Sequence, residues 1–153
     1  MSTQNDAQIL DKLNNITSQL GGDIANIDKA AAEKLIVENG LEPNKVTTAV
    51  FIGGKLNIVT WLTGFENFDG SADNKHWDGA SGPLANFWAN DDAHEVVFTA
   101  SNTRPNPSTG YKGTLMILFD DAQGNRVGAF NGPGLDMPDS AGVITKGHGR
   151  ILH

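Results

Sequence analysis

The sequence predicts a mainly β protein: a compact antiparallel β-barrel or sandwich of about seven to eight strands, of Greek-key type, preceded by an N-terminal helix or helical hairpin. Apolar residues recur with helical spacing through the first forty residues. Three of the 18 glycines lie in that stretch, and the others follow it among short β-prone runs. We therefore divide the chain into a helical segment, residues 1–40, and an antiparallel β domain, residues 41–153.

The helical segment is predicted from its apolar spacing and its glycines. Ile9, Leu13 and Ile16 are spaced four and three residues apart, which places them on one stripe of a helix. The adjacent glycines Gly21-Gly22 cost roughly 2 kcal/mol relative to alanines in a helix interior, so we expect a break there. Gly40 is suited to the C-terminal end of the second half.

The β domain is predicted from short apolar runs that alternate with turn residues. Gly53-Gly54 joins the first two runs, and such a dipeptide between β-prone segments is a hairpin signal. A second hairpin is predicted around the turn residues 120–125. The predicted strands are residues 46–52, 55–62, 84–89, 94–101, 114–119, 126–131, 142–146 and 150–152.

Composition narrows the classes of partner. The net charge of −7 argues against nucleic-acid binding, because an acidic chain releases no counterions on DNA or RNA, and it disfavours anionic membranes. The absence of cysteine removes disulfides and thiolate chemistry. The sequence has no apolar run of about 18 residues, so no transmembrane segment is predicted. No cofactor is predicted.

Two stretches are predicted as loops, where binding residues concentrate. Residues 65–83 are rich in Gly, Asp and Asn yet carry aromatic residues, and residues 102–110 are rich in Pro, Asn and Ser. Trp77 lies in the polar loop and is expected to be exposed, whereas Trp61 and Trp88 lie in strand-like runs and are expected in the core. The predicted ligand-binding residues are Phe65, Phe68, Trp77, Asp78 and Tyr111.

The same loop supplies three carboxylates, Asp69, Asp73 and Asp78. Calcium takes six to eight oxygen ligands, which an acidic loop can provide, so these residues are a candidate calcium site. The spacing does not match the EF-hand pattern. The alternative is that the Asp, Asn and Gly residues form turns in which Asx side chains bond to local backbone.

No catalytic motif is recognised, and the protein is predicted not to be an enzyme. Ser81 lies in the sequence GASGP, which lacks the last glycine of the GxSxG elbow. The four histidines show neither HxH nor HExxH spacing, so a zinc site would have to be assembled by the fold.

Three roles remain open for the helix predicted over residues 6–39. It inserts at a membrane interface, it self-associates along a coiled-coil seam to form a homo-oligomer, or it packs against the β domain. Six acids, three lysines and no aromatic anchor in the first forty residues argue against insertion.

Three pieces of the β domain carry a family resemblance. Residues 113–128 (GTLMILFDDAQGNRVG) combine an apolar strand, a Phe-Asp turn with glycine and an apolar-Gly pair. Phe68-Asp69-Gly70 and residues 82–91 (GPLANFWAND) precede them. In this order the pieces resemble the virulence-associated (Vap) proteins of actinobacterial pathogens, over residues 46–150. The helical lead and the loop at residues 102–110 depart from the family.

The resemblance implies a compact eight-stranded antiparallel barrel with a Greek-key layout, exported and acting on host compartments, without known catalytic residues. No residue role carries over. Secretion is therefore favoured over a cytoplasmic location, although the first residues lack the basic and apolar regions of a signal peptide.

The sequence thus predicts a non-catalytic, virulence- or toxin-like binding protein that engages a membrane, glycan or protein surface through loops of the β domain. Two alternatives are a structural module that assembles through the N-terminal helix and a small-ligand-binding barrel.

Overall fold

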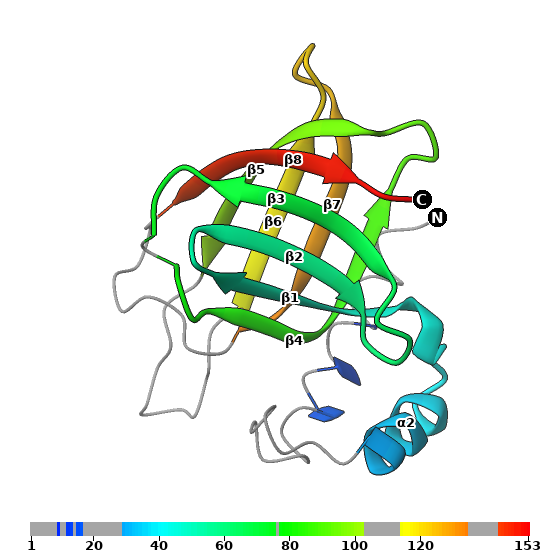
Figure 1. The fold of residues 1–153 in the computed structure, drawn as a ribbon. Coiled ribbons are helices and arrows are strands. Elements are labelled where there is room, and N and C mark those ends of the chain that lie inside the picture. Colours follow the sequence, from blue (N-terminus) through cyan, green and yellow to red (C-terminus); the bar gives the residue numbers. More distant parts are fainter. Residues whose placement is uncertain are drawn as a thin grey trace.

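The predicted fold class is confirmed: the chain forms a closed antiparallel barrel of eight strands (Figure 1). The computed structural model describes residues 9, 12, 13, 15, 16, 29–75, 77–102, 114–134 and 144–153. The barrel is preceded by helix α2 (Lys29–Glu38) and the 3-10 turn η1 (Pro43–Lys45). Its strands are β1 (Val46–Ile52), β2 (Lys55–Thr60), β3 (Glu66–Ala72), β4 (Ser81–Ala89), β5 (Glu95–Asn102), β6 (Thr114–Asp120), β7 (Arg126–Pro133) and β8 (Thr145–Ile151).

The strand order follows two Greek keys in tandem. Around the barrel the order is β1-β2-β3-β8-β5-β6-β7-β4. Strands β1 to β3 are consecutive neighbours and β4 returns beside β1, while β5 to β7 are consecutive neighbours and β8 returns beside β5. The pairs β3–β8 and β4–β7 join the two keys into a closed ring, which leaves no sheet edge.

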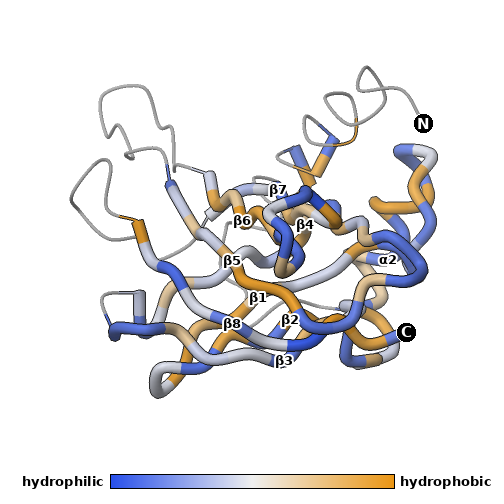
Figure 2. Tube along the Cα trace, turned by 90° about the horizontal axis from the view of Figure 1, so that it is seen from above, coloured by the Kyte–Doolittle hydropathy of each residue, from blue (hydrophilic) through white to orange (hydrophobic). Residues whose placement is uncertain are grey.

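Alternation along the strands places one face of a strand in the barrel interior and the other at the surface. In β5, for example, Val96, Phe98 and Ala100 are buried and the residues between them are more exposed. Burial alternates in the same way along β2 and β6. Figure 2 shows hydrophobic and hydrophilic segments following one another along the chain. The inward side chains of all eight strands form one buried apolar group, the interior cluster. Its largest members are Trp77, Phe51, Phe68, Phe98, Phe119 and Phe130.

Glycines make room for the interior rings. A β-carbon added at Gly70 or Gly149 would lie 2.6 Å from the ring of Phe68, and one at Gly147 would lie 2.5 Å from the ring of Phe98. The rings therefore rest directly on the backbone of β3 and β8. At these positions the rings leave no room for a side chain larger than glycine.

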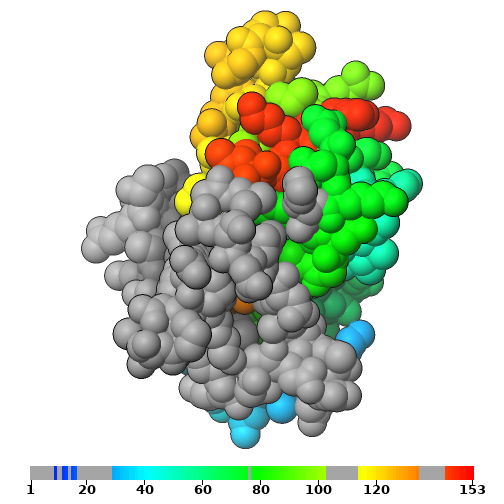
Figure 3. Space-filling view, turned by 90° about the vertical axis from the view of Figure 1, so that its left-hand side faces the viewer, coloured from blue at the N-terminus to red at the C-terminus, as the bar shows by residue number. Residues whose placement is uncertain are grey.

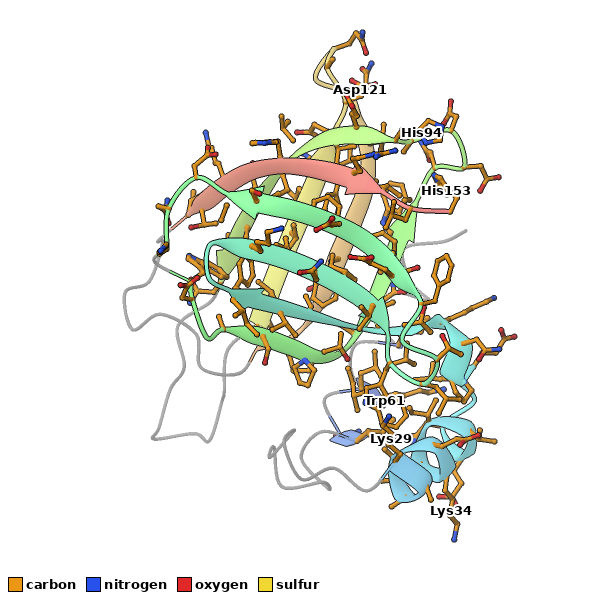
Figure 4. All side chains as sticks on the ribbon, viewed as in Figure 1. Lys29, Lys34, Trp61, His94, Asp121 and His153 are labelled. Carbon is orange, nitrogen blue, oxygen red and sulfur yellow. The ribbon has the colours of Figure 1, made fainter. Side chains whose placement is uncertain are left out.

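The helical segment packs on the outside of the barrel. Leu13, Ile16 and Ile36 are buried together with Val46 of β1 and Leu84 of β4, and we call these five residues the junction cluster. Trp61, in the turn after β2, packs against this cluster on the side of the barrel that faces α2 (Figure 4). Of the three predicted roles for the segment, the described residues show packing against the β domain. Self-association through residues 6–39 stays a prediction, although the buried stripe leaves less apolar surface for it.

The predicted end of the helical segment is confirmed. Helix α2 ends at Glu38, and Gly40 follows it with a φ of +76°, the left-handed conformation of a glycine cap. The amide of Leu41 donates to the carbonyl of Ile36 at 3.0 Å, which closes the last turn. The predicted break at Gly21-Gly22 lies outside the described residues. Among the described residues, no helix is long and apolar enough to cross a membrane.

Two strand predictions are wrong. Residues 66–72, predicted as part of a loop, form β3 with Phe68 and Gly70 buried. The predicted short strands at 142–146 and 150–152 are replaced by one continuous strand, β8, that includes Gly147 and Gly149. In both places glycine and polar residues suggested turns, whereas the inward glycines of β3 and β8 lie against the rings of Phe68 and Phe98, which face the barrel interior from the same or the adjacent strand.

Candidate binding groove

A groove of about 610 Å³ lies where the helical segment meets the barrel, and we call it the junction groove. Its volume is within the range usual for small-ligand sites. Ile9 and Leu13 of the helical segment line it on one side, and β1, β4 and the turn before β3 line it on the barrel side. The barrel residues include Val46, Thr47, Thr60, Phe65, Asn67, Ala85, Asn86, Phe87, Trp88, Leu152 and His153.

Phe65 is an exposed aromatic side chain on this groove. The turn that carries it is fixed by Gly64, whose φ is +72°, and by the Thr60 amide, which donates to the Phe65 carbonyl at 2.8 Å. The Phe65 amide in turn donates to the Thr63 hydroxyl at 3.2 Å. The ring is 51% exposed even though its backbone is held on both sides. A turn whose backbone is held in this way loses little backbone entropy when a ligand covers the ring.

Trp88 is the second exposed aromatic residue. Its neighbour Phe87 points inward and meets Phe119 edge to face at 5.8 Å, so strand alternation turns Trp88 outward. Its cross-strand partner on β7 is Ala129, whose small side chain leaves the indole 39% exposed. Phe65 and Trp88 therefore give the groove two aromatic surfaces from different elements.

Amide side chains supply the polar lining. Asn67 donates through Nδ2 to the Thr60 hydroxyl at 2.9 Å and to the Phe65 carbonyl at 3.2 Å, which fixes its orientation. Asn44 and Asn86 line the groove as well. Side-chain amides both donate and accept hydrogen bonds without carrying charge.

The groove carries little net charge. Glu42 and Lys45, which both line it, form an ion pair of 3.4 Å with each other. At the other end, Nε2 of His153 donates to the Ala93 carbonyl at 2.5 Å, and the His153 ring meets His94 edge to face at 5.5 Å (Figure 4). The arrangement suits a neutral ligand better than an ion.

A second concave surface lies over β3, β8 and β5 and, unlike the junction groove, carries several unlike charges. It has a volume of about 530 Å³ and is lined by charged side chains. Arg150 of β8 lies in register with Asp69 of β3 and Glu95 of β5, and Lys55 and His148 lie beside them. We call these five residues the charged wall. Water hydrates and salt screens such exposed charges, so a charged face is an ordinary solvent surface.

The predicted ligand-binding residues are only partly brought together. Phe65 lines the junction groove. The prediction that Trp77 is exposed is wrong: it is fully buried in the interior cluster, and its ring centroid lies 5.4 Å from that of Phe51. Phe68 is also fully buried, because it faces inward on β3, so neither side chain contacts the groove. Tyr111 lies outside the described residues.

The structure does not assemble the predicted calcium ligands. Asp78 accepts a hydrogen bond from the Gly54 amide at 2.9 Å, which ties its loop to the β1–β2 hairpin. Asp69 accepts one from Asn57 Nδ2 at 3.1 Å on the outside of β3. In the described parts of the chain, which include Asp73, no three His, Asp or Glu side chains group as a metal site.

Trp88 was misassigned by sequence reasoning, which placed it in the core. A signal for its exposure is present in Phe87-Trp88, since two adjacent large residues in a strand point to opposite faces and only one can be inside. The helical wall of the groove has no such signal, because nothing local in the sequence shows where Leu13 docks.

No protein-family model, no curated protein and no solved structure matches this chain.

Proposed function

We propose that this chain is a non-catalytic binding protein that holds a short, neutral saccharide in the junction groove. The observation that carries the proposal is the pairing of two exposed aromatic rings, Phe65 and Trp88, with amide side chains in one groove of about 610 Å³. Sugar rings have apolar C–H faces that stack on aromatic rings, and their hydroxyls exchange hydrogen bonds with amides.

Charge supports a neutral ligand over an ionic one. The groove's two oppositely charged side chains, Glu42 and Lys45, pair with each other, so neither is an uncompensated site for an ion. The chain as a whole carries −7, which opposes anionic ligands and anionic lipid surfaces. Among the three surfaces predicted from sequence, a glycan fits this lining better than a membrane.

The lining also supports binding without chemistry. A glycosidase needs two facing carboxylates, one of which acts as a proton donor. Among the described residues that line the groove, Glu42 is the one with a carboxylate side chain. This side chain is exposed and paired with Lys45. The resemblance to the Vap proteins agrees with a non-catalytic, virulence- or toxin-like role, and it stays an expectation from sequence.

A glycan array followed by isothermal titration calorimetry tests the proposal. Neutral saccharides of one to four units are titrated into the full chain, into Phe65→Ala and into the control Val97→Ala. Val97 is as exposed as Phe65 but lies on β5, away from the groove. We expect binding that Phe65→Ala weakens at least about fivefold and Val97→Ala leaves unchanged. Silence on the array, or equal losses in both variants, contradicts the proposal.

A further inference from the structure

Strand β3 contains a bulge at Asn67, which lines the junction groove. Ile58 of β2 pairs with Phe68 of β3. The next pair joins Val59 to Glu66 and skips Asn67, which is therefore the extra residue of the bulge. A bulge turns a side chain away from the direction that strand alternation would give it, and bulges are common beside functional sites.

The neighbours of Asn67 occupy the two ordinary faces of the strand. Phe68 is fully buried in the interior cluster. On the outer face, Glu66 and Asp69 accept hydrogen bonds from Asn57 Nδ2 at 2.9 and 3.1 Å. Asn67 shares neither set of contacts and lines the groove instead. The bulge therefore lets β3 keep a phenylalanine inside the barrel and still direct an amide at the groove.

The hydrogen bonds of Asn67 decide which end of its amide is available to a ligand. Nδ2 donates to the Thr60 hydroxyl oxygen at 2.9 Å and to the Phe65 carbonyl at 3.2 Å. A backbone carbonyl can only accept, so the amide atom beside it must be the nitrogen. Both hydrogens of the amide are used in this way, and the oxygen remains for a ligand.

Oδ1 of Asn67 has no hydrogen-bond partner among the described residues. It is not one of their buried polar atoms either, so water or a ligand can reach it. The backbone is held as well, because the Leu152 amide donates to the Asn67 carbonyl at 2.9 Å. The acceptor is therefore in place before a ligand binds, which lowers the entropic cost of binding.

We propose that Asn67 determines the specificity of the junction groove: its Oδ1 is a fixed acceptor that selects saccharides with a free hydroxyl group at one ring position. A hydroxyl group can donate to this oxygen, whereas a deoxy position or a methyl ether cannot. A methyl ether would also displace water from the oxygen without replacing its hydrogen bond. The inference rests on the proposed function, because it concerns the ligand of the same groove.

Thr60 is the positioning residue for this acceptor. It is buried, and its hydroxyl oxygen takes one of the two amide hydrogens of Asn67. Asn44 provides the contrast within the groove: it is exposed, and its side chain makes no hydrogen bond with the described residues. The Asn44 amide can therefore present either end to a ligand, so it does not distinguish a donor from an acceptor.

NMR titration with hydroxyl-deleted probes tests the inference. The probes are methyl glucoside, methyl galactoside and methyl mannoside, each with its single-position deoxy derivatives. We expect one deoxy position to weaken binding to the wild type about tenfold and to leave binding to Asn67→Ala unchanged. The matched control, Asn57→Ala, removes an amide that also makes two hydrogen bonds but lies outside the groove. It is expected to keep the wild-type discrimination.

Two further measurements test whether the acceptor is fixed. Thr60→Val, which is nearly isosteric, leaves the Asn67 amide with a single anchor and is expected to reduce the discrimination to less than about threefold. In the free protein, the side-chain amide hydrogens of Asn67 are expected to exchange with solvent more slowly than those of Asn44. Far-UV circular dichroism confirms that each variant is folded.

The outcomes separate this inference from the proposed function. If the probes bind but the deoxy loss is the same in Asn67→Ala as in the wild type, the inference is overturned and the proposed function stands. The inference is also overturned if Thr60→Val keeps the wild-type discrimination or if the Asn67 amide exchanges as fast as that of Asn44. Binding by none of the probes counts against the proposed function itself, and the inference falls with it.

Discussion

The interior cluster and the junction cluster are both fully buried and apolar, yet they are built differently. The interior cluster takes side chains from all eight strands of a closed ring, and each of these strands is hydrogen-bonded to a neighbour on both sides. The junction cluster joins one helical layer to the outer face of β1 and β4. The barrel is therefore the rigid scaffold, and the junction, where the groove lies, is the part that can open separately.

The largest expected effect is in the interior cluster. Phe68→Ala removes a ring that lies 5.0 Å from Phe119 and 5.9 Å from Phe98 and leaves a cavity that the closed barrel cannot collapse. We expect a loss of about 3–5 kcal/mol in the free energy of unfolding, measured by urea denaturation. Phe68→Leu serves as the milder control. A loss below about 1 kcal/mol for Phe68→Ala would show that the barrel is loosely packed.

The second effect tests the inward glycines of β3 and β8, which lie against the rings of the same cluster. In Gly147→Ala the new methyl group would meet the Phe98 ring and the Ser71 backbone, which cannot both move. We expect a loss of about 3 kcal/mol from overpacking. The adjacent outward residue provides the control: His148→Ala should change stability by less than about 0.5 kcal/mol. Equal thermal midpoints for the two variants contradict a filled interior.

The third effect belongs to the junction cluster. Ile36→Ala removes apolar contact with Val46 and Leu84, and we expect a loss of about 2 kcal/mol because the helical layer can settle into the space. Hydrogen exchange should show faster exchange in α2 while the strands remain protected. If the strands lose protection together with α2, the two clusters form one cooperative unit, which contradicts separate opening of the junction.

The smallest effect lies outside both clusters, in the β6–β7 hairpin, whose tip stands clear of the barrel (Figures 1 and 3). Hydrogen bonds from the Asn125 and Gln123 amides, each 2.9 Å from Asp121 Oδ1, lower the pKa of this carboxyl group. Because the folded pKa is lower than the unfolded one, the ionised form stabilises the turn above the unfolded pKa. This contribution is lost as the pH falls through the folded pKa.

An NMR titration of the hairpin amides measures that transition. We expect Asp121 to titrate below an ordinary aspartate and the hairpin amides to shift with it, while both clusters are unaffected. In Asp121→Asn the pH-dependent shift should disappear. A normal Asp121 pKa would mean that the turn gains nothing from its carboxylate.

Most of the fold could be predicted from the sequence, but few residues of the candidate site could. The β1–β2 and β6–β7 hairpins were predictable because local turn residues flank apolar runs. Strands β3 and β8 were not, since their inward glycines look like turn residues until the strand register places them against the rings of Phe68 and Phe98. Trp77 was placed outside for a related reason, because its polar neighbours suggested a loop.

The groove could not be read from any single segment. Leu13, Phe65, Trp88 and His153 are far apart in the sequence and meet only through the closed topology. Of these four residues, only Phe65 is among the ligand-binding residues predicted from the sequence, because an aromatic residue in a polar turn is a local feature. The helical wall depends on how the segment docks, which apolar spacing alone does not specify.

Mapping of amide chemical shifts during a titration with the tightest-binding neutral saccharide tests the central claim most directly. We expect the shifts to concentrate at Phe65, Asn67 and Trp88, with the interior cluster and the charged wall unchanged. Shifts centred on Asp69, His148 and Arg150, or no saturable shift with any neutral saccharide, would contradict the assignment of binding to the junction groove.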